Sequence, residues 1–299
     1  MVTKSNIETG LKDLGLKRGD VVVVHSSLSC FGEVEGGAET VVDALLAVIG
    51  DEGTLVVPTF NFNPGVFDPK ETPSIVGKIT EAVRNRWNAV RSLHPTHSVA
   101  AIGFLAEAII EGHEKADPFG RGSALFKVLQ ANGKILQLGT THTSNSMIHV
   151  AEEIAGVPYL ERQRRVGIKT AQGKVIYKWV RRPGCSHGFD ALDDEIDPDV
   201  ISQSFIGDCT ARLMSARAIV DAAVELLKFD PEALLCDQPD CASCAEARAM
   251  TAAIETEKQD KEVIELAEEE ERMRRFIESK FEGSTVDFLD HNEHGFSSN

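Results

Sequence analysis

One stretch of this sequence combines the residue types that acid–base catalysis needs. A polar loop, residues 140–146, follows an apolar run and leads into a predicted helix that carries His149 one turn before Glu152 and Glu153. Residues three or four apart on a helix lie on the same side, so either carboxylate can contact the imidazole. A histidine held in one tautomer by a carboxylate is a competent general base. We therefore predict a catalytic role for His149, although most lone helical histidines have none.

A second stretch could bind an anion. An apolar run, residues 21–24, leads into residues 25–29, His-Ser-Ser-Leu-Ser, and then into two glycines before a predicted helix. Such a loop presents backbone N–H groups, hydroxyls and the positive end of a helix dipole to a pyrophosphate or an amide chain. The sequence lacks the endings of a Walker loop and the glycine spacing of a dinucleotide site. An ordinary strand–helix turn is the alternative interpretation.

A third stretch, residues 91–98, crowds two histidines and several hydroxyls into a loop before a predicted strand. Loops at strand ends are common places for binding sites. His94 and His97 could begin a zinc site, but no carboxylate or thiol lies near them in the sequence. The alternative is that one of them caps the loop by hydrogen bonding.

A fourth stretch follows residue 182. Cys185 and His187 lie two apart and could form a thiol nucleophile with its base, but no feature that would activate the cysteine is visible. The acidic residues that follow are better suited to bind cations. We predict that Asp190, Asp193 and Asp194 hold a cationic substrate.

Three cysteines, Cys236, Cys241 and Cys244, resemble part of a structural zinc site. Either Cys209 or Asp237 could be the fourth ligand. A turn between helices that binds no metal explains the cysteine spacing equally well. We therefore predict no metal site, with these three thiols as the alternative. In a cytosolic chain the six cysteines are expected as thiols and not as a disulfide framework.

Composition limits the classes of partner. The formal net charge is −16, which disfavours nucleic acid and attracts cations, although acidic residues concentrated in the last fifty positions account for part of it. The first residues are polar, and no apolar run is long enough to span a bilayer. We therefore expect a cytoplasmic protein with no membrane partner.

The elements that must position these residues alternate along the chain. An apolar strand at 20–25, a helix at 39–48 and a strand at 53–58 form a βαβ-like unit. Together with the elements that follow, they predict an α/β fold in which one main domain, residues 1–250, has a central mixed sheet covered by helices. Residues 251–299 are predicted to be an acidic helical appendage or a partly disordered tail. The remaining predicted elements are helices at 5–16, 77–90, 105–112, 123–131, 147–155 and 213–228, strands at 98–102 and 134–138, and a hairpin at 167–180.

Several blocks of the sequence together resemble the aminoglycoside 3-N-acetyltransferase family. Their order and spacing extend over residues 5–250, which makes the set specific where any one block is not. The matching blocks are residues 24–29, 36–38, 40–45, 53–60, 91–92, 94–95, 97–101, 103, 117–120, 123, 133–136, 138–139 and 149–152.

The resemblance implies the α/β fold peculiar to this family and direct acetyl transfer from acetyl-CoA, as a co-substrate, to the 3-amino group of an aminoglycoside. It implies that His149 is the catalytic base and that a carboxylate orients it, with Asp190 as the first choice and Glu152 as the second. It implies no tightly bound cofactor, and a role in antibiotic resistance. The residues that it places against acetyl-CoA are Ser26, Ser27, Leu28, Ser29, His97, Ser98, Val99, Phe119 and Ser123.

The residues at 183–190 and 236–244 depart from the resistance enzymes of the family and leave the acceptor open. One alternative is an acyl-CoA-dependent transferase that acts on a different, biosynthetic amine. A more distant alternative is a hydrolase that uses Cys185 or a serine, or a scaffold that binds CoA without catalysis.

Overall fold

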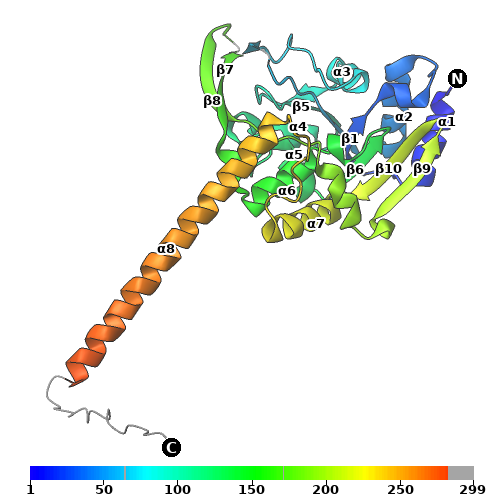
Figure 1. Ribbon diagram of the computed structural model, residues 1–299. Helices are drawn as coiled ribbons and strands as arrows, with labels where there is room; N and C mark the ends of the chain where they lie inside the picture. The colour runs from blue at the N-terminus through cyan, green and yellow to red at the C-terminus, as the bar shows by residue number, and fades with distance from the viewer. Residues whose placement is uncertain (64, 171, 282–299) are drawn as a thin grey trace, which may run out of the picture. The chain divides into compact units, whose positions relative to one another are not determined.

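The computed structural model describes residues 1–63, 65–170 and 172–281, and a seven-stranded mixed sheet lies at its centre (Figure 1). The strand order is β4-β5-β2-β1-β6-β10-β9. β1 runs parallel to β2 and β6, and the other neighbours are antiparallel. The predicted mixed sheet is confirmed. The strands are β1 (Val21–Ser26), β2 (Thr54–Pro58), β4 (Val90–Arg91), β5 (Val99–Gly103), β6 (Lys134–Leu138), β9 (Ile201–Ile206) and β10 (Cys209–Ser215).

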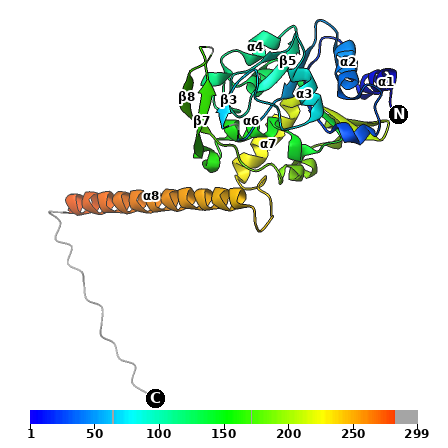
Figure 2. The same ribbon diagram turned by 90° about the horizontal axis from the view of Figure 1, so that it is seen from above.

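Helices cover both faces of this sheet. Val21 and Val23 of β1 belong to one apolar cluster, together with residues of α4 to α7, whereas Val22 and Val24 belong to a second cluster with α1, α2 and α3. The valine run is apolar throughout because each face of β1 is buried. Figures 1 and 2 show α1 beside α2 near the N-terminus. The helices are α1 (Lys4–Leu14), α2 (Gly37–Ile49), α3 (Lys78–Arg84), α4 (Ala106–Ile110), α5 (Ala124–Gln130), α6 (Met147–Ala155), α7 (Ala216–Phe229) and α8 (Ala242–Phe281).

A second, three-stranded sheet has the order β3-β7-β8, with β3 at Val66–Phe67, β7 at Gln163–Lys169 and β8 at Val175–Arg181. The predicted hairpin at 167–180 is therefore present but starts four residues earlier. Its outer strand is exposed: Tyr177 and Trp179 are 58% and 67% accessible. Apolar residues at every second position, as at 177 and 179, are typical of a strand, but here the alternation does not mean that these side chains are buried.

Strands β9 and β10 have no counterpart among the elements that the sequence predicts. The helix predicted at 213–228 begins only at Ala216, because residues up to Ser215 pair with β6 and β9. The Ser215 hydroxyl then caps α7 by accepting a hydrogen bond from the Ala218 amide at 3.4 Å. The helix predicted at 77–90 is likewise shorter, ending at Arg84.

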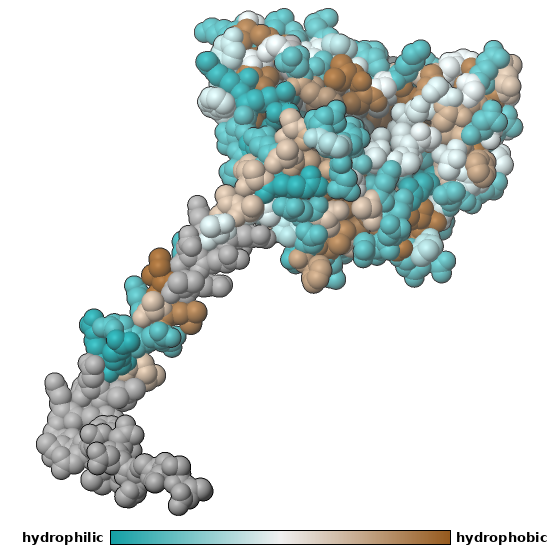
Figure 3. Space-filling model, in the orientation of Figure 1, coloured by the Kyte–Doolittle hydropathy of each residue, from teal (hydrophilic) through white to brown (hydrophobic). Residues whose placement is uncertain are grey.

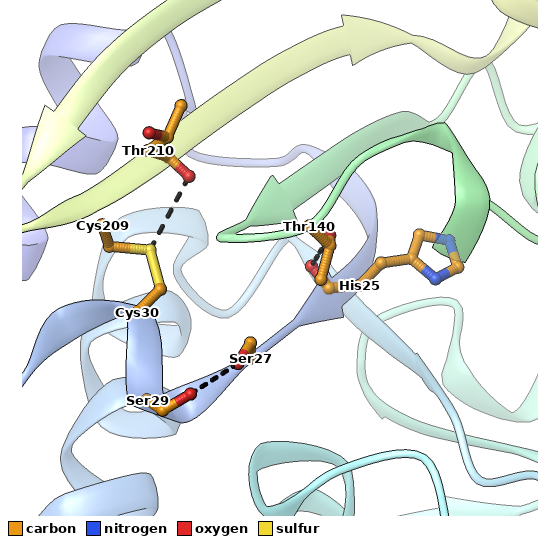
Figure 4. Close-up of a disulfide and its surroundings, with 7 residues drawn as sticks. All are labelled: His25, Ser27, Ser29, Cys30, Thr140, Cys209 and Thr210. Atoms are coloured by element: carbon orange, nitrogen blue, oxygen red, sulfur yellow. Dashed lines mark hydrogen bonds between the residues drawn. A yellow bond between two sulfur atoms is a disulfide. The ribbon is translucent and has the colours of Figure 1, made fainter. Parts of the chain in front are cut away.

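Cys30 and Cys209 form a disulfide, so the expectation that all six cysteines are thiols was wrong (Figure 4). The bond joins the 3-10 turn Leu28–Phe31, just after β1, to the first residue of β10. Both ends lie beside Leu138, the last residue of β6, which pairs with Ser26 on one side and Ala211 on the other. The pairing was invisible in the sequence because β10 was not predicted.

The chain divides into two compact units, Met1–Thr251 and the residues from Ala252 onward. Within the second unit the described side chains of α8 are largely hydrophilic (Figure 3). Ile264, Leu266 and Met273 are more than half exposed, and Ile254 is partly buried. Residues 282–299 of the predicted tail lie outside the described residues. In the part of the chain that the structure describes, no helix is both long and apolar enough to cross a membrane.

Candidate active site

A cavity of about 660 Å³ lies at the carboxyl ends of β1 and β6. Ligands commonly bind at this edge of α/β sheets, because the loops that leave the strands meet there. The second sheet and the loop after β8 contribute the opposite wall. The polar and charged residues of the lining are His25, Ser26, Thr80, His97, Thr140, Thr143, Ser144, Asn145, Ser146, His149, Gln163, Arg164, Arg182, Cys185, Ser186, His187 and Ser243.

His149 reaches this cavity from α6 and contacts a buried carboxylate. Its Nδ1 atom lies 2.6 Å from Oε2 of Glu152, one turn later on the same helix. The Tyr159 hydroxyl donates a hydrogen bond of 3.1 Å to the other oxygen, Oε1. Glu152 is 1% exposed, so these two contacts replace its water. An ionised Glu152 can only accept, which places the proton of a neutral imidazole on Nδ1 and leaves the Nε2 lone pair free.

Two aromatic rings hold the imidazole of His149 in place. Phe119 stacks on it with ring centroids 4.8 Å apart and planes 22° apart. Phe189 meets it edge-on at 4.9 Å. Both rings are buried, so the imidazole has little freedom to rotate away from Glu152.

The histidines of the loop at 91–98 form a buried network. Nδ1 of His94 accepts hydrogen bonds from the backbone amides of Thr96 and His97, at 3.3 and 3.0 Å. His94 therefore caps the loop by hydrogen bonding, which was the alternative to a zinc site. Burial lowers the pKa of His94 and His97 well below the ordinary value, and neighbouring histidines lower it further. Both rings are neutral at physiological pH.

Two guanidinium groups, Arg164 and Arg182, also line the cavity. Burial, and then the charge of Arg182, lower the pKa of Arg164. Nε of Arg164 is buried without a hydrogen-bond partner. None of the described lining residues is a carboxylate, so this part of the cavity favours an anion.

A sequence profile described as aminoglycoside 3-N-acetyltransferase matches residues 23–228. This chain belongs to the aminoglycoside 3-N-acetyltransferase family. Among curated relatives, aminoglycoside N(3)-acetyltransferase IX of Micromonospora chalcea is 31% identical over 265 residues, which is 76% of this chain and 94% of the relative. The resemblance inferred from the sequence blocks is thus confirmed.

Solved structures of the family share the fold. A mutant of the aminoglycoside acetyltransferase AAC(3)-IVa in complex with a gentamicin is 30% identical, with a TM-score of 0.77, and the match covers 83% of this chain and 97% of that one. The enzyme AAC-IIIb in binary complex with CoASH is 25% identical, with a TM-score of 0.69 and coverage of 76% and 96%. The predicted fold class is confirmed.

The carboxylate nearest the imidazole is not the one that the sequence analysis preferred. Asp190, its first choice, accepts hydrogen bonds from the Thr141 hydroxyl and the Thr143 amide, at 3.0 and 3.1 Å, and so closes a loop instead. Glu152, the second choice, contacts His149 directly. The contacts of Tyr159 with Glu152 and of Phe189 with His149 were not predicted, since nothing in a linear pattern places these rings beside the helix.

The acidic loop does not face the cavity either. Asp193 pairs with Arg212 and lies 3.2 Å from Nε2 of His142. Asp194 is exposed, and neither it nor Asp190 belongs to the lining. The three predicted substrate-binding carboxylates, Asp190, Asp193 and Asp194, therefore lie outside the lining of this cavity. Arg164 and Arg182, which the sequence analysis passed over, occupy the wall instead.

The predicted acetyl-CoA residues divide into two groups. Ser26, His97 and Phe119 line the cavity. The others do structural work outside its lining: Ser27 and Ser29 bond to each other at 2.9 Å, Leu28 belongs to the 3-10 turn, Ser98 donates to the Thr59 carbonyl, Val99 is in the core, and Ser123 caps α5.

The structure supports neither the cysteine nucleophile nor the three-cysteine zinc site with Cys209 or Asp237 that the sequence suggested. Burial raises the pKa of Cys185 to about 11, which disfavours a thiolate nucleophile, and its contact with His187 is the backbone amide at 3.4 Å. Cys209 is in the disulfide, and Asp237 points into solvent beside Arg248. The fourth side chain close to the thiols of Cys236, Cys241 and Cys244 is instead Cys185.

Proposed function

We propose that this chain transfers the acetyl group of acetyl-CoA to the 3-amino group of an aminoglycoside, with His149 as the general base. Family membership supplies the reaction class. The contact between His149 and Glu152 at the cavity wall supports the assignment of His149 as the base.

In the proposed reaction the acceptor amine loses a proton to Nε2 of His149 and its nitrogen attacks the thioester carbonyl. The C–N bond forms, and the C–S bond then breaks to release CoA. A primary ammonium gives up two protons in total, of which one leaves with the thiol and the other passes to water. A base of this kind contributes roughly 10²–10⁴-fold to the rate. Glu152 stabilises the imidazolium as it forms, because the carboxylate accepts a hydrogen bond from its Nδ1–H group.

We infer that Arg164 and Arg182 receive the phosphate groups of acetyl-CoA. Guanidinium groups bind phosphate oxygens in bidentate fashion, and this pair has no acidic residue in the described cavity lining to neutralise it. A bound phosphate would also satisfy the buried Nε of Arg164.

The cationic acceptor needs negative charge, and two carboxylates line a second cavity that His149 also reaches. A small second cavity is lined by His149, by the carboxylates of Glu152 and Glu153, and by Arg181 and Arg182. Three carboxylates, Asp117, Glu153 and Glu161, share the single guanidinium of Arg181. With Glu152 and Glu153 beside His149, this cavity suits an ammonium group better than the loop at 190–194, which lines neither cavity.

The decisive experiment measures thiol release from acetyl-CoA by the purified chain. The acceptors are a panel of aminoglycosides, matched analogues without the 3-amino group, and simple diamines, and NMR identifies the acetylated nitrogen. Turnover that requires the 3-amino group supports the proposal. Equal turnover of the analogues would reject the regiochemistry, and turnover of simple diamines alone would assign the chain to another amine.

A further inference from the structure

Four sulfur atoms converge where two distant segments meet. Cys185 lies in the loop after β8, Cys236 and Cys241 lie in the segment that leads into α8, and Cys244 lies in the first turn of α8. All four Sγ atoms lie within 4.8 Å of one another, with Cys185–Cys236 at 3.9 Å and Cys236–Cys244 at 3.5 Å. All four cysteines are free thiols, unlike the Cys30–Cys209 pair.

These separations match one tetrahedral metal ion. A Zn–S bond of about 2.3 Å at tetrahedral angles puts the ligand sulfurs about 3.8 Å apart. An iron–sulfur cluster distributes its cysteines over two or more iron atoms and so spreads them more widely. Within the described residues, this is the one group of three or more metal-binding side chains that lies close enough to share an ion.

The backbone around the thiols is built for close approach. A Cβ atom on Gly188 would lie 2.6 Å from the Leu234 carbonyl oxygen and 2.8 Å from the Cys236 nitrogen, so only glycine lets the two segments touch. The His187 amide points at Cys185 Sγ, 3.4 Å away. The amides of Cys244 and Ala245 both donate to the Cys241 carbonyl, which fixes the turn.

Positive charge flanks the sulfur atoms. Four thiolates around a divalent ion carry a net charge of −2. The guanidinium of Arg248 donates twice to the Cys236 carbonyl, both at 3.2 Å, and that of Arg162 donates to the Ser243 carbonyl and hydroxyl at 3.1 and 3.0 Å. Both arginines therefore sit next to ligand residues and fix their backbone, and each also pairs with carboxylates, Arg248 with Glu232 and Asp237 and Arg162 with Glu246.

We propose that Cys185, Cys236, Cys241 and Cys244 bind one Zn²⁺ ion in a closed structural site. The ion fastens the loop after β8 to the start of α8. Arg182, Pro183, Gly184, Ser186 and Ser243 belong to these same segments and line the main cavity, so the site holds one wall of it in place. That consequence rests on the proposed function, whereas metal binding does not.

The test uses the full chain. Elemental analysis after purification from zinc-containing medium should give about one zinc per chain, and Co²⁺ added to the chelator-stripped protein should give the d–d absorption of a tetrahedral thiolate site. Cys241→Ser should lower the bound zinc to less than about a tenth of an equivalent. Cys30→Ser, which removes a cysteine outside the cluster, should keep the full equivalent.

Two results would overturn the proposal. One is folded wild-type protein, with four thiols titrated as free, that takes up less than about a tenth of an equivalent of added zinc. The other is zinc content that is equal in Cys241→Ser and wild type. The cobalt titration needs no variant, so it decides the matter even where Cys241→Ser fails to fold. Neither readout depends on turnover.

Discussion

The Nδ1 atom of His149 lies 2.6 Å from Oε2 of Glu152, and the second oxygen of the same carboxylate accepts the Tyr159 hydroxyl. Because Glu152 is buried and held at both oxygens, it fixes the tautomer of the imidazole as well as its orientation. The free Nε2 is then on the ring that lines the main cavity. This arrangement gives each of the three side chains a separable role.

Glu152→Gln should reduce kcat while it leaves the KM for acetyl-CoA within about twofold. An amide can donate its N–H to Nδ1, which would push the proton to Nε2 and remove the base. We expect kcat to fall roughly 10²–10⁴-fold. Steady-state kinetics at saturating acceptor, with circular dichroism to check folding, measures the effect.

Asp190→Asn is the matched control for this change, since it removes one negative charge from a residue that does not contact His149. It should change kcat by less than about threefold. If Asp190→Asn were as damaging as Glu152→Gln, the base would be oriented by the loop at 190 and not by its own helix.

The sequence predicted the parts of the site that lie within one element. His149 and Glu152 share a helix, so their spacing showed that Glu152, like Glu153, could contact the imidazole, although Asp190 was the preferred partner. The alternation of polar loops with apolar strands also located the cavity edge at β1 and β6. The roles of Tyr159, Arg164 and Arg182 were not predicted. Their contacts depend on tertiary packing, which no local sequence pattern encodes.

The preference for Asp190 failed for a related reason. An acidic loop after glycines resembles a substrate site, but a carboxylate can equally well close a neighbouring loop through its hydroxyl and amide, as Asp190 does. The fourth cysteine of the cluster was not predicted for the same reason, because its contacts depend on the tertiary fold. Cys185 is 51 residues from Cys236, and only the tertiary fold brings the two sulfurs to 3.9 Å.

Arg182→Gln should raise the KM for acetyl-CoA about tenfold, equivalent to about 1.4 kcal/mol, with a smaller effect on the KM for the acceptor. An anionic co-substrate loses a charged contact, whereas a cationic acceptor loses none. Arg165→Gln is the control, because Arg165 neighbours Arg164 in β7 but packs over Tyr177. Equal effects of both substitutions would point to the overall field of the protein and not to a phosphate site.

Acid should destabilise the fold through its buried histidines. Burial lowers the pKa of His25 to about 3 and that of His113 to about 4, and it also lowers those of His94 and His97. The unfolded histidines titrate near about pH 6.5, so between that pH and the folded pKa the unfolded state binds more protons. Stability is therefore unaffected above about pH 6.5 and falls as the pH decreases, by up to about 3 kcal/mol for His113 alone.

Urea unfolding at about pH 7.5, 6.5 and 5.5 measures this slope. His113→Gln should remove up to about 1.4 kcal/mol per pH unit from it, whatever its effect on stability at neutral pH. The exposed His187 provides the control through His187→Gln, which should leave the slope unchanged. A slope that is the same in all three proteins would mean that His113 titrates as it does in the unfolded chain.

Gly139→Ala should destabilise the protein more than a left-handed backbone alone explains. Gly139 has φ of +65°, and a Cβ atom there would lie 2.2 Å from Cβ and 2.6 Å from Sγ of Cys30, which the disulfide holds in place. Gly19 has φ of +82° and no described atom within 4 Å of such a Cβ, so Gly19→Ala isolates the backbone cost of about 1 kcal/mol. We expect Gly139→Ala to cost at least about 2 kcal/mol more, since neither β6 nor the disulfide can move away without breaking strand pairs. Urea unfolding of both variants measures the difference, and equal costs would show that the turn after β6 yields freely.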